Sequence, residues 1–304
     1  MPAIHMHSTI VAASFQISRA AVSMCAAGIV LFLVALWASK TDIARASGLD
    51  KVVALSNLCF AIPLAVFGAE HLSSARFIML GVPSYMPWRL FWAYFVGFVL
   101  LSASLSIATK IQVRWSGLLF GIMMFLFVAM VHIPRVLASP GDRIPWTIVV
   151  REMSFAGGGW LLAGNAMRGQ GKSKLITVGG VLIAIAALFF GVEHFLHPAG
   201  CPGVPLEKLM PAWIPGRLLI GYLTGTIPLV AGTIILLTKK KRMAATYLGT
   251  WIVLLVLFIY GPILIAQLSD PSAAAQIEGI NYFADTLLFG GAILALASAT
   301  PRTD

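Results

Sequence analysis

Charged residues are scarce in this sequence: Asp, Glu, Lys and Arg make up 11% of its 304 residues. Soluble domains usually carry about 25% charged residues, so the composition excludes an ordinary soluble globular protein. Cysteine is also scarce. Three residues and no C-x-x-C pair indicate neither a dithiol redox centre nor an internal disulfide. The regular alternation of polar and apolar residues that marks the strands of a membrane β-barrel is missing as well.

Apolar residues take the place of the missing charges. They make up 59% of the chain and form long runs separated by short charged segments. About 20 apolar residues are enough for a helix to cross the hydrocarbon core of a bilayer. The sequence therefore predicts an all-α, polytopic membrane helical bundle with about nine transmembrane helices, at residues 20–38, 52–72, 89–109, 115–136, 146–166, 175–196, 214–237, 244–267 and 280–299.

Positive charges gather on one side of this topology. When each charge is assigned to its nearer membrane face, 13 Lys and Arg residues fall on one side and 8 on the other. Cytoplasmic loops carry the excess of Lys and Arg, so we expect the N-terminus outside and the C-terminus inside. The net charge of +10 then belongs to an inner membrane face, and no nucleic-acid partner is predicted.

Several motifs recur at a fixed spacing. Arg89 and Arg217 are 128 positions apart (217 − 89), and the same spacing relates the prolines, glycines and tyrosines around them. The "FGAEH" of residues 67–71 recurs as "FGVEH" at 190–194, 123 positions later (193 − 70). The shorter spacing means that the second copy has a loop about five residues longer. We interpret the pattern as a duplication.

The duplication divides the chain into three segments. Four helices per copy is an even number, so both copies enter the membrane from the same side and form a parallel repeat, unlike the inverted repeats of many transporters. The predicted segments are a tail and anchor helix at 1–50, a first four-helix unit at 51–168 and a second at 172–300.

Ionisable residues gather where the predicted helices reach the outer interface. The first unit brings Glu70, His71, Arg89, His132, Arg135, Arg151 and Glu152 to one depth; the second brings Glu193, His194, His197, Arg217, Tyr260 and Asp285. Ionisable residues in membrane segments are costly and are typically functional. The candidate catalytic residues are Glu70, His71, Arg89, His132, Glu193, His194 and Arg217.

Each candidate also has a structural interpretation. Glu70 and Arg89 could form an ion pair that closes the helix bundle. His71 could be a neutral, hydrogen-bonded residue at the interface instead of a proton carrier. The glycines at 157–159 are expected to allow close helix packing.

Metal and haem sites are not predicted. His197 follows Glu193 by four residues and could share its helical surface, but Pro198 ends the helix there. The spacing of His71 and His132 alone does not support haem ligation. Cys201, in an outer loop, is a weak candidate for a reactive thiol.

The repeated motifs resemble a known family. "GxEH", then "P-x-x-x-P-x-R" leading into "FWAYFVG" or "LIGYLTG", then "H-x-P-R" and "SFAGGGWLLAG", resemble the DoxX/DoxD-like membrane proteins over residues 51–300. The second copy departs from the pattern, with Tyr260-Gly261-Pro262 in place of His132-Ile133-Pro134. The resemblance implies two fused four-helix units in the cytoplasmic (inner) membrane of a prokaryote. Some relatives are associated with quinone-linked oxidoreductases.

Two functional hypotheses follow. In the first, the protein is a redox-linked component: a quinone lies near the outer surface, Glu70 or Glu193 exchanges protons, and histidines and arginines bind the ring oxygens. Its partners would be the lipid bilayer, a quinone, and membrane or periplasmic redox proteins. In the second, it is a non-catalytic scaffold or accessory subunit that binds partner proteins. A transporter is the third alternative; against it, no predicted span carries a clear mid-membrane charge relay, and Asp285 stands alone.

Overall fold

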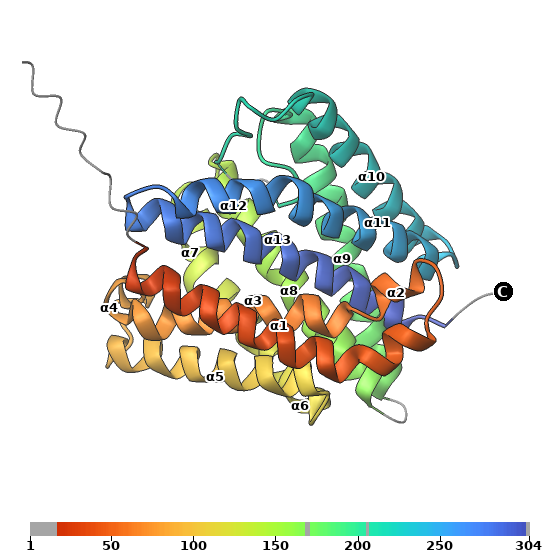
Figure 1. The fold of residues 1–304 in the computed structure, drawn as a ribbon, viewed down its shortest axis with the longest axis horizontal. Coiled ribbons are helices and arrows are strands. Elements are labelled where there is room, and N and C mark those ends of the chain that lie inside the picture. The colour runs from red at the N-terminus through yellow and green to blue at the C-terminus, as the bar shows by residue number, and fades with distance from the viewer. Residues whose placement is uncertain (1–16, 168–170, 205–206, 302–304) are drawn as a thin grey trace, which may run out of the picture.

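The computed structural model describes residues 17–167, 171–204 and 207–301, with the backbone alone at 171–173. These ranges form an all-helical bundle (Figure 1). The first half contains α1 (Arg19–Arg45), α2 (Asp50–Val53), α3 (Ser56–Ser73), α4 (Ala75–Ile78), η1 (Met79–Gly81), α5 (Arg89–Thr109), α6 (Val113–Phe127), η2 (Val128–His132), α7 (Ile133–Ala138) and α8 (Arg143–Ala166). The second contains α9 (Gly171–Leu196), α10 (Arg217–Leu237), α11 (Lys241–Leu255), η3 (Val256–Tyr260), α12 (Gly261–Leu268) and α13 (Ala273–Ala299).

Within the described ranges, eight helices are long and apolar enough to cross a membrane. Each falls on one of the predicted spans. The remaining predicted span, 146–166, is helix α8, which is long enough but carries Arg151 and Glu152 in its middle and is not among the eight. The prediction of an all-α, polytopic membrane bundle is therefore confirmed. The chain is an integral membrane protein by the length and composition of its helices.

Helix boundaries in the two halves correspond. Helix α5 and helix α10 begin and end 128 positions apart, as do α6 and α11. Before α5 the backbone of Trp88 has φ = 54°, and before α10 Gly216 has φ = 65°, so the same left-handed turn starts both helices. The spacing of the sequence motifs is thus also the spacing of the helices.

A π-helical turn interrupts the same helix in each half. The turns η2 and η3 cover Val128–His132 and Val256–Tyr260, and each is followed two residues later by a proline, Pro134 or Pro262. Proline lacks a backbone N–H, and its ring clashes with the carbonyl four residues earlier, so an α-helical turn cannot continue unchanged. The wider turn places His132 and Tyr260 at equivalent positions.

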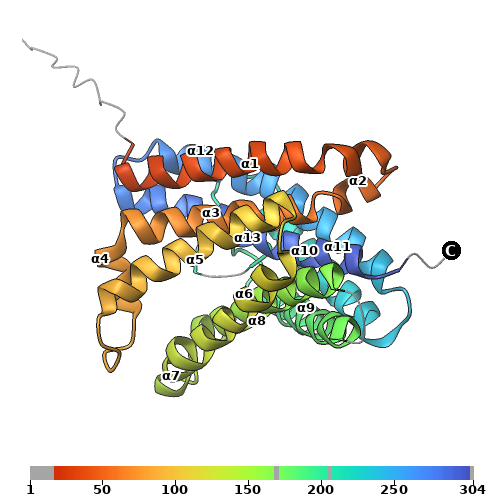
Figure 2. The same cartoon turned by 90° about the horizontal axis from the view of Figure 1, so that it is seen from below.

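The two halves are interleaved. Within the halves, α3 packs on α5, α6 on α8, α9 on α10, and α11 on α13. Helix α1 also packs on α3 within the first half. Three further large contacts cross between the halves: α3 packs along α13, α8 along α9, and α8 along α13. Figure 2 shows α13 lying beside α3. Neither half is therefore a separate four-helix bundle, because the first helix of each half rests on the last helix of the other.

Three consecutive glycines allow α8 to approach three helices. A Cβ atom would lie 3.0 Å from the Gly179 carbonyl oxygen of α9 at Gly157, and 2.5 Å from Ala292 Cβ of α13 at Gly158. At Gly159 it would lie 2.8 Å from the Gly117 carbonyl oxygen of α6. These distances leave no room for a side chain, so the predicted packing role of this segment is confirmed.

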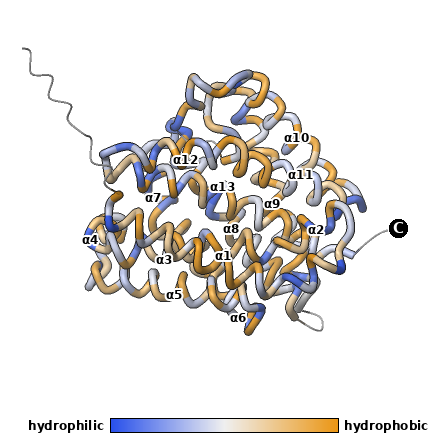
Figure 3. The backbone as a smooth tube through the Cα atoms, in the orientation of Figure 1, coloured by the Kyte–Doolittle hydropathy of each residue, from blue (hydrophilic) through white to orange (hydrophobic). Residues whose placement is uncertain are grey.

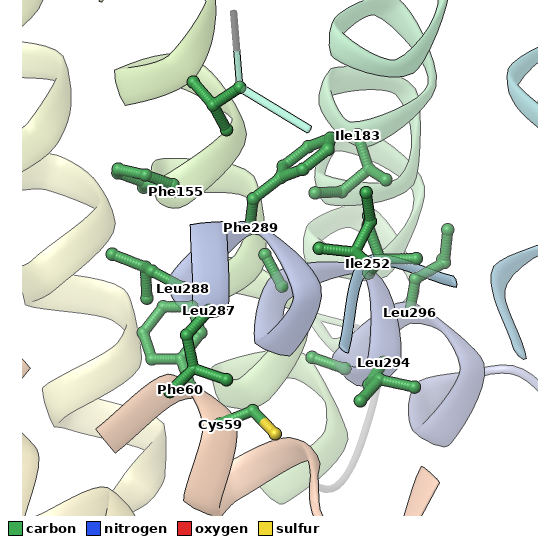
Figure 4. Close-up of a cluster of buried hydrophobic side chains, with 14 of the residues drawn as sticks. Cys59, Phe60, Phe155, Ile183, Ile252, Leu287, Leu288, Phe289, Leu294 and Leu296 are labelled. Carbon is green, nitrogen blue, oxygen red and sulfur yellow. The ribbon is translucent and has the colours of Figure 1, made fainter. Parts of the chain in front are cut away.

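The buried core surrounds α13. Figure 4 shows Leu287, Leu288 and Phe289 of this helix among Phe60 of α3 and Phe155 of α8. The outward faces of the outer helices are also apolar, and Figure 3 shows hydrophobic colour along the middle of the bundle and hydrophilic colour toward its two ends. Exposed apolar side chains of this kind are stable against lipid, so these faces contact the bilayer.

Candidate functional site

A cavity of about 960 Å³ lies between α3, α5, α6, η2, α8 and α13. Its wall comes from both halves, because α13 of the second half closes the space between the helices of the first. Figure 2 shows α5 and the α6–α7 segment diverging toward the end that carries α4 and α7. The cavity occupies this divergence, at the end where the sequence predicts the outer interface.

The cavity wall is mostly apolar. Its aromatic and methionine members are Phe67, Phe77, Met86, Trp92, Phe95, Phe120, Met123, Met124, Phe127, Met130 and Phe155. Two members of the wall, Phe95 of α5 and Leu126 of α6, are 46% and 51% exposed, so the cavity is open beside these two helices. Apolar side chains exposed along membrane-spanning helices are stable against lipid, and we interpret this opening as facing the bilayer.

Glu70 and His71 lie at the polar end of the cavity. Glu70 is buried, and its Oε1 accepts a hydrogen bond from Asn281 Nδ2 of α13 at 3.1 Å. No ion pair reaches Glu70 within the described ranges. The Nδ1–H of His71 donates to the Phe67 carbonyl oxygen at 2.8 Å, and its Nε2 has no protein partner there. Both side chains line the cavity, so a carboxylate without a cation and a free ring nitrogen face the same space.

An ion-pair cluster joins α8 to α13 beside them. Arg151 donates to Asp285 Oδ2 at 2.7 Å and to Glu152 Oε1 at 3.1 Å. The sequence indicated that Asp285 stands alone, and this is wrong. Asp285 has Arg151 as its partner because α13 packs directly on α8. Two buried atoms of this region, Arg151 Nε and Asn281 Oδ1, have no hydrogen-bond partner. An unsatisfied buried polar atom costs about 1–3 kcal/mol, so a bound polar group would be stabilised here.

Arg89 does not pair with Glu70. Its Nε donates to the Val82 carbonyl oxygen at 2.9 Å and its Nη2 to the Leu80 carbonyl oxygen at 3.0 Å. Arg217 makes the equivalent bond to the Met210 carbonyl oxygen at 3.2 Å. At the start of both α5 and α10, an arginine side chain therefore hydrogen-bonds the preceding loop to the helix. The suggested ion pair between Glu70 and Arg89 is wrong.

His132 lies across the cavity from α3, in the π-helical turn η2. Its electrostatic neighbours are Glu152, Arg151 and Arg135. Of the first-half residues predicted to share one depth, Glu70, His71, His132, Arg135, Arg151 and Glu152 all line the cavity.

Glu193 and His194, the second-half equivalents of Glu70 and His71, are not part of this cavity wall, whereas Asp285 of the second half is. Glu193 Oε2 accepts from Arg143 at 3.0 Å, so this acid is paired across the α8–α9 contact. His194 uses both ring nitrogens: Nδ1 donates to the Phe190 carbonyl oxygen, and Nε2 accepts from the Gly203 N–H at 2.9 Å. These contacts give Glu193 and His194 structural partners that Glu70 and His71 lack.

The longer loop of the second half folds inward. Cys201, Val204 and Met210 are at most 1% exposed, and they belong to the main hydrophobic core. Burial raises the pKa of the Cys201 thiol to about 12, so this cysteine is an inert core residue and not a reactive thiol. His197 is exposed at the start of the same loop. Within the described residues, no group of three or more His, Cys, Asp or Glu side chains is arranged to hold a metal ion.

A smaller cavity, of about 410 Å³, lies at the opposite end of the bundle. Its charged wall residues are paired: Lys110 with Asp42, and Arg242 with Asp50. These pairs hold the helix ends together on the predicted cytoplasmic side. The first cavity differs because it keeps an acid without a cation.

No known family model, curated protein or solved structure matches this chain. The candidate site therefore depends on geometry alone.

Sequence reasoning missed three residues of the site as functional candidates: Arg151, Asp285 and Asn281. The repeat held a signal for two of them. Gly279 occupies the second-half position of Arg151, and Gly157 the first-half position of Asp285. Arg151 and Asp285 thus carry opposite charges at positions where the other half has glycine. Such a complementary pair of differences indicates a contact between the two halves.

Proposed function

We propose that the protein binds a lipid-soluble ring compound of the quinone class in the first-half cavity, as a redox-linked component of the membrane. The main support for this proposal is the shape and chemistry of the cavity. It is apolar along its length, it opens sideways to lipid, and it ends at a buried acid and a histidine with a free ring nitrogen.

The apolar part fits a ligand that is dissolved in the bilayer. A quinone enters from lipid and not from water, and the opening beside Phe95 and Leu126 faces lipid. The volume of about 960 Å³ is at the upper end of the range for small-molecule sites, so a substituted ring and the start of its isoprenoid tail can be accommodated. Methionines such as Met123 and Met124 adapt to irregular apolar shapes.

The polar end fits the head of such a ring. A bound quinone supplies chemistry that couples electron transfer to proton transfer. Among the residues of this chain, Glu70 is placed to hold or pass a proton at its carboxylate, and His71 to accept a hydrogen bond from the ligand through Nε2. Arg151 Nε is a buried donor without a partner and can bind an oxygen that gains charge.

The wider assignment follows the family resemblance. We infer a protein related to the DoxX/DoxD-like proteins, in the inner membrane of a prokaryote, with the N-terminus outside and the C-terminus inside. The polar end of the cavity then lies near the outer surface. A membrane or periplasmic redox protein at that surface would exchange electrons with the bound ring.

Ligand binding in lipid nanodiscs tests the proposal. Trp92 lines the cavity, so a short-chain benzoquinone should quench tryptophan fluorescence in a saturable way beyond its effect in nanodiscs with an unrelated membrane protein. Ala93→Phe fills the cavity and should weaken binding at least tenfold, because Ala93 is buried in its wall. Leu90→Phe, on the lipid face one turn earlier, is the matched control and should bind like the wild type.

A second pair of variants tests the acid. Glu70→Gln should lower quinone binding or quinol-linked activity while the protein remains folded. Glu193→Gln should leave binding unchanged and lower stability, because Arg143 loses its buried partner. If the wild type shows no saturable quenching, or if Ala93→Phe binds normally, the quinone proposal fails and the scaffold hypothesis becomes the better one.

A further inference from the structure

In the second half, a segment of the chain itself lies between His194 and Tyr260, the equivalents of His71 and His132. One peptide group, between Pro202 and Gly203, is held from both sides. The Gly203 N–H donates to His194 Nε2 at 2.9 Å, and the Tyr260 hydroxyl donates to the Pro202 carbonyl oxygen at 2.6 Å. His194 and Tyr260 thus hold one planar group that has a donor on one edge and an acceptor on the other.

The partners of His194 determine which of its nitrogens carries the proton. The Phe190 carbonyl can only accept, so Nδ1 is the protonated nitrogen. The Gly203 amide can only donate, so Nε2 is the acceptor. The two assignments agree with a neutral imidazole, and no choice of tautomer is left.

The first half repeats this arrangement without such a segment. His71 corresponds to His194, and its Nδ1–H donates to the Phe67 carbonyl oxygen at 2.8 Å, so its Nε2 is also an acceptor. The segment after it is about five residues shorter than its counterpart, and it coils into α4 and η1. The acceptor on His71 therefore faces the cavity without a protein donor among the described residues.

We propose that the ring is bound in its hydroxylated, reduced form, as a quinol whose O–H donates to His71 Nε2. This inference rests on the proposed function. The oxygens of an oxidised quinone can only accept, and an acceptor placed against Nε2 would leave both atoms unsatisfied. The quinol hydroxyl takes the place that the Gly203 N–H takes in the second half.

The residue opposite His71 explains why the first half has room for a ring at the place where the second half holds a peptide group. His132 stands at the position of Tyr260, and histidine is the shorter side chain. At equivalent backbone positions, the shorter histidine leaves more space opposite His71 than Tyr260 leaves opposite His194. A six-membered ring with oxygens at opposite ends spans this space, with its far oxygen accepting from the His132 ring N–H.

Calorimetric titration under argon, in nanodiscs with empty nanodiscs as the reference, tests the inference with three ligands: a short-chain benzoquinone, its quinol, and the dimethyl ether of the quinol. The wild type should bind the quinol about tenfold more tightly than the other two, since only the quinol has a donor. His71→Phe should remove this preference. His71→Gln should retain part of it, because its amide oxygen can accept from the ligand.

Tyr260→Phe is the matched control from the second half, and it should leave the ratio of quinol to quinone affinity unchanged. Equal affinity of the wild type for quinone and quinol would overturn the inference while the proposed function stands. A preference that persists in His71→Phe would do the same. Failure of all three ligands to bind would instead remove the proposed function, and the inference with it.

Discussion

The ion pair between Arg151 and Asp285 gives the sharpest test of the electrostatics described above. The two atoms lie 2.7 Å apart, the side chains are 14% and 12% exposed, and Glu152 contacts the same guanidinium at 3.1 Å. Removing one partner of a buried pair costs about 3–5 kcal/mol because a charge remains uncompensated. Arg151→Met leaves two acids without their cation and should lower the free energy of unfolding by about that amount. Asp285→Asn keeps the pair with Glu152 and should cost about 1–2 kcal/mol.

The double variant distinguishes this reasoning from simple loss of packing. Adding Asp285→Asn to Arg151→Met removes one of the two uncompensated charges, so the double variant should be more stable than Arg151→Met by about 1–3 kcal/mol. Reversible unfolding in mixed micelles with increasing SDS, followed by circular dichroism, measures these differences. Lys110→Met is the control and should cost less, because the acid that it leaves behind, Asp42, has a 53% exposed side chain. A double variant less stable than Arg151→Met would refute the coupling.

Three further predictions concern the inward loop and the helix contacts. Tyr260→Phe should cost about 1–2 kcal/mol, because the Pro202 carbonyl loses its donor, and amide exchange should become faster in the adjoining loop; unchanged exchange would contradict this. The pKa of Cys201 is raised by burial to about 12, so its contribution to stability is full below the ordinary value of 9.0 and is lost as the pH rises toward 12; mass spectrometry should detect almost no maleimide labelling of this residue in the folded protein at pH 8. Gly117→Ala would place its Cβ 2.4 Å from a backbone oxygen of α8 and should cost about 1–3 kcal/mol in thermal or SDS unfolding, whereas Gly141→Ala, with no atom within 4 Å, should be neutral.

Sequence reasoning predicted the helices well because the membrane constrains them strongly. The span predicted at 89–109 is helix α5, Arg89–Thr109, since Pro87 precedes it and Lys110 takes a left-handed conformation at its end. The span predicted to begin at 214 begins at Arg217, because Pro215 and Gly216 form the preceding turn. The length of each apolar run, and the proline and glycine residues at its ends, therefore predict where the helices begin and end.

The partners of the site residues could not be predicted in the same way. Position along a helix predicts depth in the membrane, and by depth alone Glu70 and Arg89 are expected together. It does not tell which helices are neighbours around the bundle. Glu70 faces Asn281, which is uncharged and lies in the other half, and this contact follows only from the packing of α3 on α13. The inward fold of the loop after His194 depends likewise on three-dimensional packing.

The interleaving of the halves has a consequence for biogenesis. A chain inserted into the membrane in sequence order presents α3 to α8 first, and these helices already include most of the cavity wall. The helix that carries Asn281 and Asp285 is α13, the last of the described helices. Until it docks, Glu70 and Arg151 have no partner across the bundle and their side of the cavity is open. Binding competence should therefore appear only after α13 has been inserted, and a nascent chain stalled before α13 should engage membrane chaperones or proteases.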